Sequence, residues 1–180
     1  MICLPNVLRA YAFDIDKLNA FTAMYNDLML GDSALSKLER EMIAVAVSSH
    51  NKCYYCLVAH GAAVRQLSGD PALGEALAMN YKVAPIDARQ KAMLDFALKL
   101  TRESGSIEEA DRESLRSHGF SDRDIWDITS VTGFFNMTNR VASWDGCVPP
   151  HPWQRSSCPC LPLLCCWPNA TAIWTATLPQ

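Results

Sequence analysis

Residues 35–65 read LSKLEREMIAVAVSSHNKCYYCLVAHGAAVR, and this stretch decides the fold. Apolar residues recur every three or four positions on both sides of a short polar break at residues 50–52, as they do in amphipathic helices and not in strands. Ser36 with Glu39 has the spacing of a capping box, which starts a helix. The stretch therefore predicts one helix that starts at Ser36 and a second that starts at Cys53.

The same period of three to four residues runs through almost all of residues 14–142, and no alternation with period two is sustained. Further helix starts are expected at residues that can cap or open a helix: Asp14, Asp70 before Pro71, Asp87, Ser106 with Glu109, and Ser121. Helix ends are expected at four glycines: Gly31, Gly69, Gly105 and Gly119. Short connections between these segments predict an all-α bundle of about six or seven helices.

Composition indicates a globular protein, because 49% of the 180 residues are hydrophobic and 19% are charged. The net charge of −3, with both signs spread along the chain, gives no basis for binding nucleic acid or an anionic membrane. The first residues lack the pattern of a signal peptide, and no apolar run reaches the ~20 residues that span a bilayer. We therefore expect a cytoplasmic protein with no membrane and no nucleic-acid partner.

The composition changes abruptly after Ser143. Five of the eight cysteines, seven of the ten prolines and four of the five tryptophans lie in residues 144–180, which have little charge and no helical period. We expect residues 1–143 to form the helical domain and residues 144–180 to be an irregular tail outside it. A shifted reading frame in the gene is our first explanation of the tail. A metal-binding or interaction segment is the second, and a membrane anchor interrupted by prolines is the third.

Two cysteines and a histidine share one face of the second helix, because Cys53, Cys56 and His60 stand at positions i, i+3 and i+7. Both cysteines fall in the first turn. There, free N–H groups and the helix dipole lower the pKa of a thiol and favour the reactive thiolate. His60, one turn later, can take a proton from a thiol. The three residues form a candidate redox site.

Glu41 lies on the preceding helix, on a stripe whose other members are mostly apolar. A carboxyl in such a place is either paired with a cation or has a raised pKa and shuttles protons. The short break at residues 50–52 allows the two helices to fold back on each other, which would bring Glu41 to the face that carries the cysteines. We therefore include Glu41 in the candidate site as a hypothesis.

Zinc is the main rival use of the two thiolates and the imidazole, but a structural zinc site needs a fourth ligand, usually from a second ligand pair. A c-type haem site requires histidine directly after the second cysteine, where this chain has Leu57. We therefore expect no metal and no cofactor. His50 and His118 are expected at the surface or at helix ends, and Tyr54 and Tyr55 are expected to be packing residues and not to line a pocket.

The candidate residues match a known family signature, which is a glutamate, eleven intervening residues, and then C-x-x-C-x-x-x-H. Glu41, Cys53, Cys56 and His60 meet this spacing at every position. With NVLRAYA near its start and FFNMTNRVA near residue 140, the chain resembles the alkylhydroperoxidase D-like branch of the carboxymuconolactone decarboxylase family, specifically its peroxidase-related members. The resemblance covers about residues 5–143.

The resemblance implies an all-helical fold that assembles into trimers or hexamers with active sites near subunit contacts. It also implies a dithiol peroxidase, in which Cys56 attacks the hydroperoxide and becomes a sulfenic acid. Cys53 would then close a disulfide with it, and an external dithiol protein or small thiol would reduce the pair. His60 and Glu41 would form the proton relay.

One departure from the family pattern is Tyr55, since some active relatives carry histidine between the two cysteines. Two rival functions stay open. The first is a redox-sensing or partner-binding module that uses the same cysteine pair without turnover. The second is a lyase or decarboxylase, as elsewhere in the family, although the thiols would have no task in that reaction. The pattern specifies neither the peroxide nor the reductant.

Overall fold

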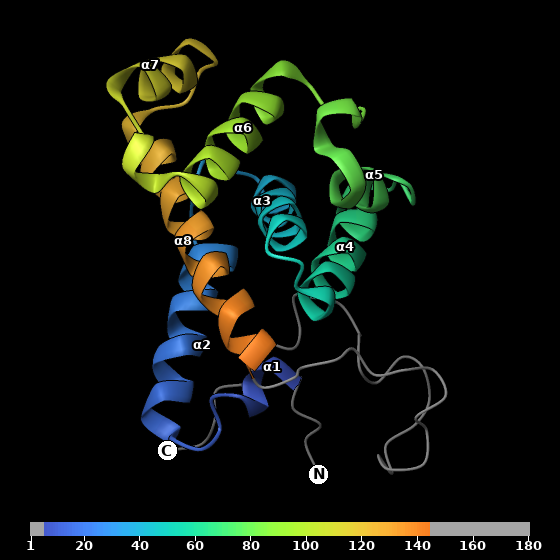
Figure 1. Ribbon diagram of the computed structural model, residues 1–180, viewed down its shortest axis with the longest axis vertical. Coiled ribbons are helices and arrows are strands. Elements are labelled where there is room, and N and C mark those ends of the chain that lie inside the picture. The colour runs from blue at the N-terminus through green and yellow to red at the C-terminus, as the bar shows by residue number, and fades with distance from the viewer. Residues whose placement is uncertain (1–5, 145–180) are drawn as a thin grey trace.

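A computed structural model describes residues 6–144 as a bundle of helices joined by turns and short connections (Figure 1). In chain order these are α1 (Asn6–Arg9), α2 (Ile15–Leu30), α3 (Lys37–His50), α4 (Tyr54–Ser68), α5 (Leu73–Asn80), η1 (Tyr81–Val83), α6 (Ala88–Arg102), η2 (Ser104–Ser106), α7 (Glu109–Ser117) and α8 (Asp122–Trp144). These residues contain no strand, and seven of their α-helices have eight or more residues, so the expected all-α bundle is confirmed. Within the same residues, no helix has both the length and the hydrophobicity needed to cross a bilayer. Apart from Trp144, the predicted tail lies outside the described residues.

Four of the expected helix starts are confirmed. Asp14 caps α2, its carboxylate accepting from two backbone N–H groups of the first turn. Ser36 and Glu39 form the expected capping box of α3, with both reciprocal hydrogen bonds present. Asp87 and Ser121 open α6 and α8 by accepting from the backbone N–H three residues later. These caps stabilise the helices because the first N–H groups of a helix have no partner inside it.

Two expected helix starts are wrong. α5 begins at Leu73, because the carboxylate of Asp70 accepts from a backbone N–H two residues later and closes a turn ahead of the helix. α7 is opened by a capping box between Glu108 and Asp111, while the serine predicted for this role lies in the preceding η2. The carboxylate of Asp111 also accepts two hydrogen bonds from Nζ of Lys99 on α6. This second partner favours the start of α7 at Glu109 over a start at Ser106.

Three of the four expected glycine ends are confirmed, since Gly31, Gly69 and Gly119 follow α2, α4 and α7. Gly69 and Gly119 have φ angles of 69° and 84°, a region that L-residues with a side chain rarely adopt. Gly105 does not end a helix, because α6 already stops at Arg102 and Gly105 lies within η2.

α3 lies in the middle of the bundle and packs against α2, α4, α5, α6 and α8 (Figure 1). α2 and α8 run together on one flank, and α4 and α5 on the other. Residues 39–48 of α3 are buried without interruption, including its charged side chains. Those charged groups therefore need partners within the protein.

Arg40 connects α2 to α3. Its buried guanidinium donates to the backbone carbonyls of Leu28, Gly31 and Leu35. These carbonyls belong to the end of α2 and to the loop that follows, where no donor within the helix is available. Arg40 thereby holds the beginning of α3, directly before Glu41, in a fixed position.

The backbones of α4 and α5 approach closely at Gly61 and Gly74. A methyl group on Gly74 would lie 2.8 Å from the backbone carbonyl oxygen of Gly61, which cannot turn away. We therefore expect Gly74→Ala to lower the free energy of unfolding by about 1–3 kcal/mol, measured as a lower melting temperature by circular dichroism. Gly133→Ala on α8 is the matched control, because no neighbour lies within 4 Å of the added methyl. Equal melting temperatures for Gly74→Ala and the unaltered chain would contradict the close approach.

Candidate active site

The connection between α3 and α4 places the two cysteines. Asn51 follows α3, and Lys52 has a positive φ of 56°, which turns the chain toward α4. The N–H of Cys53 then donates to the carbonyl oxygen of Ser48 at 3.0 Å. Cys53 is the N-cap of α4 and Cys56 lies in its first turn. The helix break and both cysteine positions are as the sequence predicts.

Cys53 and Cys56 are unbonded thiols whose Sγ atoms lie 2.8 Å apart, within hydrogen-bonding distance. Both residues are buried, at 4% and 3% exposure, in a cluster with Tyr55 and with Ala142 of α8. Sulfurs in a disulfide are about 2 Å apart. The pair can therefore close a disulfide with only a small shift.

The surroundings of Cys53 lower the pKa of its thiol from 9.0 to about 7. The largest cause is the hydrogen bond with the Cys56 thiol, and burial acts in the opposite direction. The backbone N–H of Cys56, the charge of His60 and the side chain of Asn139 lower the pKa further. Cys53 is thus the N-cap residue of α4, at a helix N-terminus where negative charge is favoured. Near neutral pH, the pair holds a thiolate in a substantial fraction of molecules.

Glu41 and His60 form a hydrogen-bonded pair between α3 and α4, with Oε2 and Nδ1 2.6 Å apart. The Glu41 carboxyl is buried, so this partner offsets the cost of removing it from water. The His60 ring also meets Phe135 of α8 edge-on, with the ring centroids 4.7 Å apart. Since Nδ1 faces the carboxylate, Nε2 is the ring nitrogen that remains to exchange a proton. The structure thus brings together the acid and the imidazole that the sequence placed on separate helices.

Asn139 of α8 is a site residue that the sequence reasoning missed. It is buried, donates from Nδ2 to the Ser48 hydroxyl at 3.0 Å, and accepts at Oδ1 from Nδ2 of Asn51 at 3.0 Å. Its side chain also hydrogen-bonds the Cys53 sulfur. A signal was present, because Asn139 follows the buried Phe135 by four residues and so places a polar group on an apolar stripe. The same reasoning had singled out Glu41.

The remaining side-chain expectations have mixed outcomes. His50 is exposed and ends α3, and His118 caps the end of α7, both as expected. Tyr55 is buried, as expected of a packing residue. Tyr54 is 67% exposed, so the expectation that it packs is wrong, because the first position of α4 points outward. In the part of the chain that the structure describes, no three His, Cys, Asp or Glu side chains are grouped so that they could hold a metal ion.

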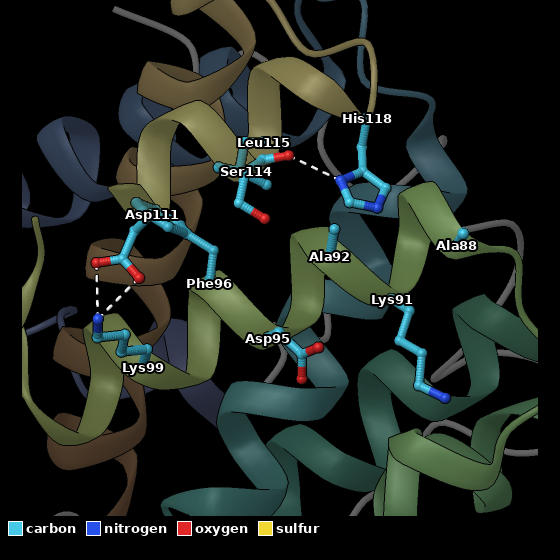
Figure 2. A pocket seen from close by; sticks show the side chains of 10 residues that line it. All are labelled: Ala88, Lys91, Ala92, Asp95, Phe96, Lys99, Asp111, Ser114, Leu115 and His118. Carbon is cyan, nitrogen blue, oxygen red and sulfur yellow. Dashed lines mark hydrogen bonds and ion pairs between the residues drawn. The ribbon is translucent and has the colours of Figure 1, made fainter. Parts of the chain in front are cut away.

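A separate cleft of about 340 Å³ lies between α6 and α7 (Figure 2). Charged groups line it, but Lys99 is paired with Asp111 at 2.7 Å, and Nδ1 of His118 lies 2.7 Å from the carbonyl oxygen of Ser114. None of the four predicted site residues lines this cleft. The thiol pair, and not this cleft, is therefore the candidate active site.

Proteins of known structure resemble the chain in sequence and in fold. A peroxidase-related protein from Silicibacter sp. TM1040 is 76% identical, with 84% of this chain and 79% of that chain aligned and a TM-score of 0.80. A peroxidase-related protein with an alkylhydroperoxidase AhpD core, from Ralstonia eutropha JMP134, is 49% identical, with coverages of 81% and 77% and a TM-score of 0.79. The model of the carboxymuconolactone decarboxylase family matches residues 16–94.

The chain belongs to the carboxymuconolactone decarboxylase family. Its expected place in the alkylhydroperoxidase D-like, peroxidase-related branch is confirmed by the two similar structures. A protein of unknown function from Agrobacterium tumefaciens shares the fold, at 24% identity, coverages of 78% and 94% and a TM-score of 0.69. A search among curated proteins finds no match. The family match contains all four residues of the predicted site and excludes Asn139.

The lowered pKa of Cys53 predicts how its reactivity depends on pH. Iodoacetamide reacts with thiolates, so its reaction with Cys53 in the reduced full chain should increase with pH around a midpoint near 7. Cys56→Ala removes the largest cause of the lowered pKa and should shift the midpoint upward, toward 9. Asn139→Ala removes a smaller cause and should shift it upward by less. Mass spectrometry of the Cys53 peptide at a series of pH values measures each midpoint. An unchanged midpoint in Cys56→Ala would contradict the thiol hydrogen bond as the cause.

Proposed function

We propose that the protein is a thiol-dependent peroxidase that reduces organic hydroperoxides or hydrogen peroxide through a dithiol–disulfide cycle of Cys53 and Cys56. The observation that carries the proposal is a pair of unbonded thiols 2.8 Å apart, one of which has its pKa lowered to about 7. A thiolate beside a second thiol is the state in which such a cycle begins. Similarity to peroxidase-related proteins supports a peroxide as the oxidant.

In the first step, the thiolate of Cys56 attacks one oxygen of the hydroperoxide. A sulfur–oxygen bond forms while the oxygen–oxygen bond breaks, so the sulfur is oxidised to a sulfenic acid and the peroxide is reduced. The departing oxygen takes a proton from Nε2 of His60 and leaves as an alcohol or as water, while Glu41 holds the ring at Nδ1. Before the attack, the Cys56 thiol gives its proton to the Cys53 thiolate across the hydrogen bond between the two sulfurs. Cys56 thereby becomes the attacking thiolate.

In the second step, Cys53 attacks the sulfenic sulfur of Cys56. A disulfide forms, and the leaving hydroxide takes up the proton that Cys53 released and becomes water. The low pKa of Cys53 suits this role, because the attacking form is the thiolate. An external dithiol protein or small thiol then returns two electrons and two protons to the disulfide. The thiols supply all the electrons of the cycle, which therefore uses no metal and no other cofactor.

We further propose that the protein acts in the cytoplasm as a trimer or hexamer. Thiol reductants are abundant in that compartment. The assembly is implied by the family resemblance, and it is supported by large apolar side chains that stay exposed on the single chain. Among these are Tyr54 and Val58 on α4 and Trp126 and Met137 on α8.

A redox-sensing or partner-binding module is the second candidate function. The burial of both sulfurs favours it, because a disulfide with 3–4% exposure is hard for an external reductant to reach. In this alternative, the same pair is oxidised once and changes the binding of a partner, with no catalytic cycle.

Turnover distinguishes the two candidates. With a dithiol donor, the reduced full chain should consume many equivalents of hydroperoxide in a stopped-flow assay, whereas a sensor consumes one. Cys56→Ser should abolish consumption, because it removes the attacking sulfur. Cys53→Ser should still form a sulfenic acid, which a dimedone trap and mass spectrometry detect, and this acid should over-oxidise for lack of a partner. Sulfenic acid that forms in Cys56→Ser and not in Cys53→Ser would reverse the two roles.

Glu41→Gln tests the proton relay. The substitution keeps the size of the side chain but replaces the carboxylate that pairs with Nδ1 of His60. We expect the rate of peroxide reduction to fall about tenfold or more, within the ~10²–10⁴-fold effect of positioned proton donors. Glu75→Gln is the matched control, because Glu75 is exposed on α5 and pairs with Arg65 instead. If Glu41→Gln matches the unaltered chain in peroxide rate and cysteine reactivity, Glu41 is not part of the relay.

A further inference from the structure

The segment NVLRAYA, residues 6–12, lies against the thiol pair. Val7 of α1 packs on the cluster formed by Cys53, Tyr55, Cys56 and Ala142. α1 accordingly lies beside the C-terminal end of α8 (Figure 1). The proposed mechanism assigns no role to this segment, although its Val7 packs on the cluster that contains the reacting sulfurs.

Tyr11, two residues after the end of α1, is held firmly in this segment. Its ring stacks on Phe21 of α2, with centroids 4.0 Å apart and an angle of 18° between the ring planes. Its backbone N–H donates to the carbonyl of Leu8, and its carbonyl accepts from the N–H of Asp14. Phe21 in turn stacks on Phe134 of α8 at 5.3 Å. The position of the Tyr11 ring is therefore set by α2 and α8, and not by its hydroxyl.

The hydroxyl of Tyr11 is unusual. Its oxygen is buried, and among residues 6–144 it has no hydrogen-bond partner. Buried tyrosine hydroxyls normally have one, because leaving such a group unpaired is costly. Burial, and then the charge of the Cys56 thiolate, raise the pKa of Tyr11. The hydroxyl therefore keeps its proton at neutral pH and can donate a hydrogen bond. The charge of Cys56 acts on this hydroxyl.

We propose that Tyr11 is a substrate-binding residue, whose buried, unpartnered hydroxyl donates a hydrogen bond to the peroxide oxygen that is transferred to Cys56. This inference rests on the proposed peroxidase function and adds a residue to it. An oxygen bonded to the Cys56 sulfur would satisfy the orphaned hydroxyl in the first step and in the sulfenic acid that follows. The phenol proton is not transferred, so the atom and electron balance of the cycle is unchanged. The hydrogen bond orients the peroxide and polarises the oxygen under attack.

Tyr11→Phe in the full chain tests this inference, because it removes the hydroxyl and keeps the ring that stacks on Phe21. We expect the second-order rate constant for hydrogen peroxide and for a small organic hydroperoxide to fall about tenfold or more. The pH profile of Cys56 alkylation by iodoacetamide should stay unchanged, because that reagent brings no oxygen to the sulfur. The melting temperature should not fall, because the lost group has no partner in residues 6–144.

Tyr81→Phe is the matched control, since it removes a hydroxyl that donates to Asp95 at 2.5 Å and belongs to a residue outside the cluster around the thiols. It should keep the peroxide rate constant of the unaltered chain. If Tyr11→Phe reduces peroxide as fast as the unaltered chain, the inference is overturned and the proposed function stands. If alkylation slows in parallel with peroxide reduction, Tyr11 acts on the thiolate and not on oxygen, which also overturns it. If the unaltered chain reduces no hydroperoxide, both proposals fail.

Discussion

The contact between Glu41 and His60 is the constraint on which the site depends. α3 is buried on all sides, so a carboxyl in its middle needs a partner inside the protein, and His60 on α4 supplies it at 2.6 Å. Because this contact joins the helix before the break to the helix after it, it fixes the rotation of α4 about its own axis. Cys53 and Cys56 share a face with His60, and that face is consequently turned toward α8.

Burial has two opposing effects on the thiol pair. Desolvation raises the pKa of Cys53, whereas hydrogen bonds from Cys56 and Asn139 and the charge of His60 lower it, and the lowering effects prevail. The interior thus holds a thiolate because it supplies donors where water is excluded. Aromatic rings extend the same interior toward the N-terminal segment, from His60 through α8 and α2 to Tyr11.

Local sequence predicted most helix boundaries, and two of the errors made from it depend on groups outside the local sequence. The caps at Ser36 and Asp87 were predictable because a capping hydrogen bond joins residues three positions apart. The start of α7 was not, because Asp111 also binds Lys99 of α6. Exposure of Tyr54 was missed for a related reason, since the neighbours that would cover a side chain lie on other helices.

The sequence by itself determined that residues 14–142 form helices and that Cys53, Cys56 and His60 share a face, because both depend on spacing within one helix. Only the tertiary structure decided which groups meet this face. Glu41 reaches His60 across 19 positions of sequence, and Asn139 reaches Ser48 across 91. The helical period carries no information on such distances, since packing between helices brings these residues together. For that reason, spacing revealed the sulfur pair and His60, whereas only the fold showed that Glu41 contacts His60 and that Asn139 belongs to the site.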